Sequence, residues 1–96
     1  MVTKYVKTFP FEFALTCQAC PEQYDVFLEG KQVGYVRLRW GVLRCGYPDV
    51  VGEIVYYHEF DDGLQGCFDG DEDRNFHLAE IAKALYNRIN ESETVP

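Results

Sequence analysis

The chain has 96 residues, of which 47% are hydrophobic and 16% aromatic, and its formal net charge is −7. That length suits one domain with its own core, and the composition is too apolar for a disordered chain. Apolar runs stay well short of the roughly 20 residues that cross a bilayer, and the first residues lack the aliphatic stretch of a signal peptide. We therefore expect one soluble, cytoplasmic domain over residues 1–96, with a frayed tail at about 91–96.

Alternating apolar residues predict β-strands in the first half of the chain. The stretch "FPFEFAL" carries its aromatic side chains on one side, and the next two strands form a hairpin. We expect a three-residue loop, 29–31, because pairing Leu28 with Gln32 places the apolar residues of both strands on one face. The predicted strands are 9–15, 23–28, 33–40 and 42–47.

A second hairpin is predicted from "EIVYYHEF" and "LQGCF", residues 53–60 and 64–68. The alternation places Ile54, His58 and Leu64 on the inner face. The connecting Asp61-Asp62-Gly63 reads as a three-residue loop with Gly63 in the left-handed conformation.

The chain ends in a predicted helix at about 72–90, since apolar residues recur at helical spacing from Leu78 to Ile89. One apolar stripe over one apolar sheet face gives an α+β fold: a single two-layer domain with a mainly antiparallel, twisted sheet of about five to six strands and one C-terminal helix. The residues expected to be most buried are Leu38, Trp40, Tyr56, Phe60, Ile81 and Leu85. We expect His58 in the core and His77 in solvent.

The negative charge is concentrated in the last third of the chain. Residues 1–60 contain six basic and seven acidic residues, whereas residues 61–96 contain three and nine. Such a field repels nucleic acid and anionic membranes and attracts a basic protein surface. The alternative is that these acids serve solubility and helix capping. The candidate partner-binding residues are Asp61, Asp62, Asp69, Asp71, Glu72 and Asp73.

A second candidate site is a row of arginines on the outer face of the sheet. Tyr35, Arg37 and Arg39 alternate along one predicted strand, and Arg44 shares that face from the next. Guanidinium groups bind phosphate by forked hydrogen bonds, so the row predicts a site for a phosphate-bearing small molecule or an acidic partner. The alternative is neutralisation by cross-strand carboxylates, for which the candidates are Asp25, Glu53 and Glu59.

Two motifs raise the possibility of metal binding. In "DGDEDRNFHLAE" the residues Asp69, Asp71, Asp73 and Glu80 have the spacing of a calcium loop, but Arg74 occupies the position of the turn glycine. We expect an acidic helix cap instead.

Cys17 and Cys20 form a C-x-x-C, which suits half of a zinc site, without a second such pair. Together with Cys45 and Cys67 they are expected to be reduced, partly buried thiols. We expect no cofactor, no metal and no catalytic residues, since neither a Ser-His-Asp set nor a phosphate-binding glycine loop can be identified.

The hairpin "YDVFLEGKQVGYVRLRWG", a second strand pair and then a helix resemble the order of elements in short GNAT-type acetyltransferases. Those enzymes hold the pyrophosphate of coenzyme A with a basic, glycine-rich turn before the helix. Here that turn is "CFDGDEDR", which is acidic. The resemblance therefore concerns the layout of about 65 residues and implies no acetyltransferase activity.

These observations favour a small, acidic, non-enzymatic interaction protein. The specific hypothesis is a phage or mobile-element inhibitor, anti-CRISPR-like or directed at another defence system, that occupies a basic nucleic-acid-binding site on a host protein. The alternatives are a small-ligand or nucleotide-binding module (a sponge) that uses the arginine face, and a metal-binding domain. A homodimer through the open sheet face is compatible with each of these, and we expect no direct contact with nucleic acid or membrane.

Overall fold

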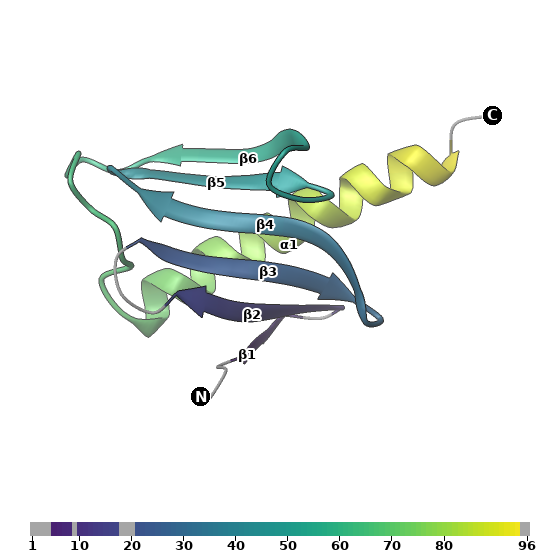
Figure 1. Cartoon of the computed structure of the whole chain (residues 1–96), viewed down its shortest axis with the longest axis horizontal. Helices are drawn as coiled ribbons and strands as arrows, with labels where there is room; N and C mark the ends of the chain where they lie inside the picture. Colours follow the sequence, from purple (N-terminus) through teal and green to yellow (C-terminus); the bar gives the residue numbers. More distant parts are fainter. Residues whose placement is uncertain (1–4, 9, 18–20, 95–96) are drawn as a thin grey trace.

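Six strands form one antiparallel sheet in which each strand pairs with the next along the chain (Figure 1). The computed structural model describes residues 5–8, 10–17 and 21–94. Short connections favour this order: the two-residue turns between β3 and β4 and between β4 and β5 can join only antiparallel neighbours, and five residues join β5 to β6. The strands are β1 (Tyr5–Thr8), β2 (Phe11–Cys17), β3 (Glu22–Leu28), β4 (Lys31–Arg39), β5 (Val42–Tyr47) and β6 (Glu53–Glu59). The first of them was not predicted, and Phe9 of the predicted first strand lies outside the described residues.

The helix α1 (Asp71–Thr94) crosses one face of this sheet and leaves the other face uncovered (Figure 1). It begins one residue before the predicted start and continues four residues beyond the predicted end. Leu78, Ile81 and Leu85 are fully buried against the sheet, which confirms both the predicted stripe and the two-layer α+β fold. Among the described residues, no helix has the length and apolar character that crossing a membrane would need.

The β3–β4 connection differs from the prediction but gives the same inner face. The turn contains two residues, Glu29 and Gly30, both at positive φ, rather than three. A bulge in β4 then shifts the register by one residue, so that Tyr24 lies opposite Val36 as predicted. A bulge and a longer loop are thus equivalent ways of keeping these side chains on one face.

The β4–β5 turn places Trp40 in solvent, and the prediction that Trp40 belongs to the core is wrong. Trp40 and Gly41 are the two turn residues, with φ of 54° and 73°. At the tip of a two-residue turn a side chain no longer alternates between the sheet faces, and the Trp40 side chain is 63% exposed. Glycine is required at position 41 for two reasons. Its φ is positive, and a Cβ there would lie 2.6 Å from the carbonyl oxygen of Asp62.

A second bulge, between Cys45 and Gly46, changes the face of one predicted core residue. Cys45 lies opposite Tyr56, whereas Gly46 lies opposite Ile54, so Val55 is the extra residue of β6. A shift of one residue exchanges the two faces of a strand. Val55 therefore packs against the core, and Ile54, predicted to be inside, is half exposed on the uncovered face.

The predicted second hairpin does not form, since residues 64–68 are irregular. This segment crosses one end of the sheet, where the carbonyls of Gln65 and Gly66 accept hydrogen bonds from the N–H groups of Gly41 and Glu22. Its backbone groups are satisfied there without a strand partner. Leu64 consequently faces solvent, and Gly63 is not in the left-handed conformation.

A buried ion pair fastens this crossing segment to the sheet. The Glu22 carboxylate, almost fully buried, accepts a hydrogen bond from Arg74 Nε at 2.6 Å and another from the Phe68 N–H at 3.2 Å. The Tyr24 hydroxyl donates to the same carboxylate. Burial alone would raise the pKa of Glu22, but the hydrogen bonds from Arg74, Tyr24 and Phe68 outweigh it and lower the pKa below its ordinary value.

His77, predicted to be exposed, is buried at the start of α1. Its ring stacks on Phe68, with centroids 5.7 Å apart, and its Nδ1 lies 3.1 Å from the Tyr56 hydroxyl. His58 is half-buried and lies 4.7 Å from the His77 ring, centroid to centroid. Desolvation lowers the pKa of His77, although Asp73 opposes the shift, so the neutral ring is favoured in this aromatic surrounding.

Candidate anion site on the uncovered sheet face

Arg37 and Arg44 lie directly opposite each other on the neighbouring strands β4 and β5. Side chains paired in this way have Cβ atoms about 4.5–5.5 Å apart, and like charges at such positions destabilise a sheet. Both guanidinium groups are on the face that α1 does not cover. The predicted arginine row therefore has its closest pair at the centre of an open surface.

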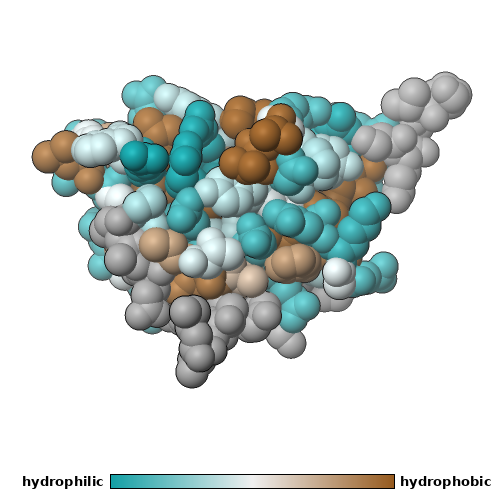
Figure 2. All heavy atoms as spheres, viewed as in Figure 1, coloured by the Kyte–Doolittle hydropathy of each residue, from teal (hydrophilic) through white to brown (hydrophobic). Residues whose placement is uncertain are grey.

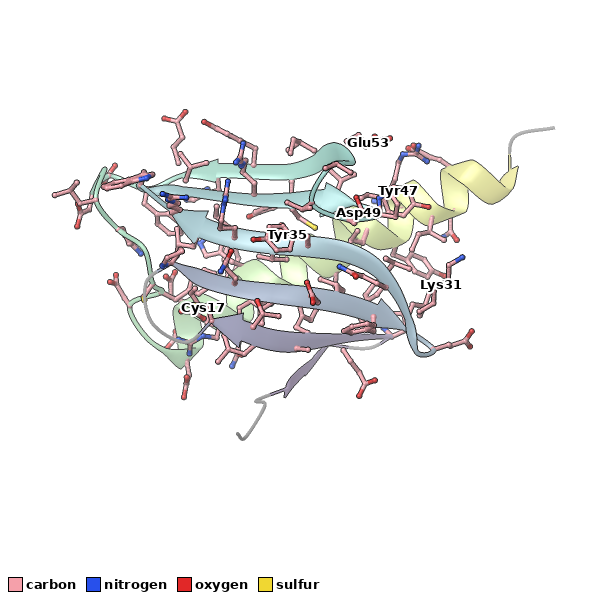
Figure 3. All side chains as sticks on the ribbon, viewed as in Figure 1. Cys17, Lys31, Tyr35, Tyr47, Asp49 and Glu53 are labelled. Atoms are coloured by element: carbon pink, nitrogen blue, oxygen red, sulfur yellow. The ribbon has the colours of Figure 1, made fainter. Side chains whose placement is uncertain are left out.

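A hollow of about 90 Å³ lies beside the two arginines, between β4, β5 and the start of β6. Tyr35, whose side chain projects from the middle of β4 on this face, forms part of its wall (Figure 3). Pockets for drug-sized ligands measure roughly 300–1,000 Å³, so this hollow suits one phosphoryl or carboxylate group. Its lining residues are Tyr35, Arg37, Arg44, Gly46, Val50 and Ile54.

Part of this lining was not predicted from the sequence. Ile54 reaches the hollow because of the β5–β6 bulge, and Val50 comes from the irregular connection between those strands. Figure 2, which views the uncovered face, shows a hydrophobic patch on the β5–β6 side bordered by strongly hydrophilic side chains. An apolar wall beside a charged pair lowers the local dielectric and strengthens electrostatic attraction to an anion.

The carboxylates proposed to neutralise the arginines have other partners. Glu53 binds Arg88 of the helix at 2.8 Å, and Glu59 accepts a hydrogen bond from the Tyr57 hydroxyl at 3.0 Å. Asp25 accepts one from the Gln32 side chain at 3.3 Å. Within residues 10–17 and 21–91, no carboxylate oxygen lies within 4.0 Å of the guanidinium nitrogens of the arginine row. The alternative, direct cross-strand ion pairs with these three carboxylates, is therefore not what the structure has.

Arg39, the remaining residue of the row, lies away from this hollow. It is exposed at the end of β4, and its guanidinium carbon is 5.8 Å from the centroid of the Trp40 ring. Both residues line a larger hollow of about 410 Å³ at the end of the sheet. The structure therefore brings Tyr35, Arg37 and Arg44 together and groups Arg39 with Trp40.

Of the six acidic residues predicted to bind a partner, Asp61 and Asp62 precede the crossing segment, Asp69 follows it, and the other three form the first turn of α1. Some of them have local partners: Asp71 pairs with Arg74, and an Asp62 carboxylate oxygen accepts a hydrogen bond from the Leu64 N–H at 2.9 Å. Asp69, Glu72 and Asp73 line a hollow of about 490 Å³ together with Phe76, which is 60% exposed. The acidic surface thus contains an accessible aromatic ring that the sequence did not single out.

The calcium-loop spacing does not produce a cluster of ligands. Because α1 begins at Asp71, Glu80 lies in its third turn, where it pairs with Lys83 at 3.0 Å. Arg74, in the position of the turn glycine, binds Glu22. Among the described residues there is no group of three or more His, Cys, Asp or Glu side chains that could hold a metal ion.

The cysteines differ in part from the expectation of reduced thiols. Cys67 is disulfide-bonded, so the expectation of a reduced thiol is wrong at this position. Cys17 and Cys45 are reduced, and burial raises the pKa of Cys45 to about 12. The Cys45 thiol therefore stays protonated at neutral pH. Cys20 of the C-x-x-C motif lies outside the described residues.

No protein-family model matches the chain, and neither a curated protein nor a solved structure is significantly similar to it. The layout resemblance to GNAT-type acetyltransferases included a second strand pair before the helix. Residues 64–68 are not a strand, so the second pair before α1 consists of β5 and β6 instead, and this order of elements alone identifies no family.

Proposed function

We propose that this protein is a non-enzymatic module that binds a phosphate-bearing anion on its uncovered sheet face. The observation that carries the proposal is the cross-strand pair of Arg37 and Arg44, neither of which forms an ion pair with a carboxylate of the described residues. Two facing cations cost free energy in the empty state. An anion between them removes that repulsion and gains charge-assisted hydrogen bonds.

The chemistry of the pair supports binding rather than catalysis. A guanidinium group offers donors in a planar fork that matches phosphate oxygens, and it keeps its proton at any physiological pH. Arg37 and Arg44 can therefore hold and orient an anion but cannot act as a general base. The apolar side chains of Val50 and Ile54 limit the access of water to one side of the site.

Calorimetric titration with inorganic pyrophosphate at low ionic strength tests this function. We expect Arg37→Ala and Arg44→Ala each to weaken binding at least about tenfold, equivalent to about 1.4 kcal/mol. Lys31→Ala is the matched control, because Lys31 lies at the opposite end of the same strand and its loss changes the net charge equally (Figure 3). Equal losses in all three variants would indicate a general charge effect and would count against a site at the pair.

A second candidate function is the occupation of a basic nucleic-acid-binding site on another protein, such as a host defence protein, by the acidic surface. The observation that favours it is the exposed Phe76 ring among Asp69, Glu72 and Asp73. Interfaces characteristically place an aromatic anchor within a polar rim, and the carboxylates would steer the encounter. On this hypothesis a phage or mobile element would use the protein as an inhibitor.

Displacement of fluorescent DNA from purified DNA-binding proteins measures this second function. We expect the wild-type protein to displace DNA from its target, and the triple variant Asp69→Lys, Glu72→Lys, Phe76→Ala to fail. Glu29→Lys, in the exposed β3–β4 turn, is the control for a change of charge. Added salt should weaken the wild-type effect, because attraction between exposed charges is screened beyond about 8–10 Å. Displacement that survives the triple variant would exclude the acidic surface.

A cytoplasmic location and a homodimer through the open sheet face stay predictions. Cys67 is disulfide-bonded, and disulfides are rare in the reducing cytoplasm. This bond therefore argues against a cytoplasmic location. Exposed Val50, Val51 and Ile54 beside the anion site supply apolar surface that a second copy would bury.

A further inference from the structure

Trp40, the single tryptophan of the chain, is exposed at a backbone position that disfavours it. It is the first residue of a two-residue turn and has a φ of 54°, where Asn or Gly is preferred. Burial of the Trp40 ring would stabilise the fold, and an Asn at position 40 would relieve the backbone strain. The chain instead has an exposed tryptophan at this position. Strained residues of this kind concentrate at ligand-binding sites.

The surroundings of Trp40 suit a flat aromatic ligand. The ring shares the 410 Å³ hollow with Pro21, Leu64 and Gly66, and Leu64 is 76% exposed. This volume is within the range of small-ligand pockets. Arg39 lies over the Trp40 ring, so the hollow combines an aromatic plane, an apolar wall and one cation.

The hollow and the anion site are lined by neighbouring arginines of β4, Arg39 in the first and Arg37 in the second. Arg39 and Arg37 are two residues apart on the same face of the strand, a separation of about 6.8 Å. A ligand that places its anionic group on Arg37 and Arg44 can therefore reach the Trp40 ring with a planar group at its other end. Nucleoside phosphates have this arrangement, with a base separated from the phosphates by a sugar.

We propose that the ligand of this face is a free nucleoside phosphate, with its base stacked on Trp40 beside Arg39 and its phosphates bound by Arg37 and Arg44. The inference rests on the proposed anion-binding function and names its ligand class. Stacking on an aromatic ring is tolerant of base identity, because every base has a π-face. The site is therefore expected to prefer nucleotides over inorganic phosphates more strongly than one base over another.

Tryptophan fluorescence tests the proposal directly, because Trp40 is the sole tryptophan. We expect ADP to quench this fluorescence, and pyrophosphate to bind by calorimetry without a comparable quench. ADP should bind at least about tenfold more tightly than pyrophosphate. Trp40→Asn should reduce ADP affinity to the pyrophosphate level while leaving pyrophosphate affinity unchanged. Asn suits the turn, so this variant should fold at least as well as the wild type. Tyr86→Ala, which removes an exposed aromatic ring from the helix, is the control.

The outcomes separate the two proposals. If ADP and pyrophosphate bind equally in both the wild type and Trp40→Asn, the anion site stands and the base site is rejected. If neither compound binds, both proposals fail. If a short oligothymidylate binds more tightly than ADP and TDP, the free-nucleotide assignment is wrong and the surface is one for single-stranded nucleic acid.

Discussion

Replacing Arg74 with leucine should cost about 3–5 kcal/mol of unfolding free energy, because it leaves the Glu22 carboxylate buried without its cation. Arg74 also holds the helix start through Asp71 and lies 5.7 Å from the centroid of the Phe68 ring. The change therefore loosens the crossing segment as well as α1. Urea unfolding at pH 7 measures the loss.

Two comparisons separate the buried charge from a general loss of an arginine. Arg88→Leu removes an ion pair with Glu53 that is much less buried than the Glu22–Arg74 pair, and we expect a smaller change. Glu22→Gln in the Arg74→Leu background should recover part of the stability, because the amide carries no charge and still accepts the Phe68 N–H. No recovery in the double variant would mean that Arg74 acts through packing alone.

The contribution of Glu22 to the pH dependence of stability should reverse in sign in the Arg74→Leu variant. In the wild type the pKa of Glu22 is lowered, so its contribution is present above the unfolded-state pKa and is lost as pH falls through the folded-state value. Without Arg74, burial raises the pKa of Glu22, and the folded state then favours the proton. The difference in unfolding free energy between the variant and the wild type should therefore become smaller as the pH falls from 7 to 4.

Periodicity predicted the parts of this fold that depend on one side of an element being buried. The stripe from Leu78 to Ile89 and the alternation around Leu38 identified the contacting faces of α1 and the sheet. The errors lie at bulges and turns. A single extra residue moved Ile54 to the uncovered face, and a two-residue turn put Trp40 in solvent. Neither event changes the apolar pattern locally, so the pattern could not reveal it.

The candidate site was predicted in part for the same reason. Alternation was sufficient to put Tyr35, Arg37 and Arg44 on one face, and the register confirmed that they are neighbours. Whether carboxylates neutralise the arginines depends on side-chain partners that spacing does not determine. Glu53, for example, is close to Arg44 in the pattern but binds Arg88 of a helix 35 residues further along the chain. The buried pair of Glu22 and Arg74, separated by 52 residues, had no sequence signal at all.

Leu85→Ala should cost about 2–5 kcal/mol, the usual loss for truncation of a fully buried leucine. Leu85 packs directly over Gly34 in β4, where a Cβ would lie 3.3 Å from Leu85 Cδ1 and 3.4 Å from Cδ2. Gly34→Ala should therefore destabilise by about 1–3 kcal/mol through overpacking. Chemical unfolding of each single variant provides both values.

The double variant Gly34→Ala, Leu85→Ala tests whether this contact sets the approach of helix and sheet. Truncation of Leu85 removes the atoms with which the new methyl group would clash, and the methyl group fills part of the cavity. We therefore expect the two losses to be less than additive by about 0.5–3 kcal/mol, as is usual for residues in contact. The carbonyl oxygen of Gly46 would also lie 3.3 Å from the added methyl group and is not removed by either substitution, so the compensation should be incomplete. Strict additivity would contradict the packing of α1 on β4, because residues that do not touch have no reason to couple.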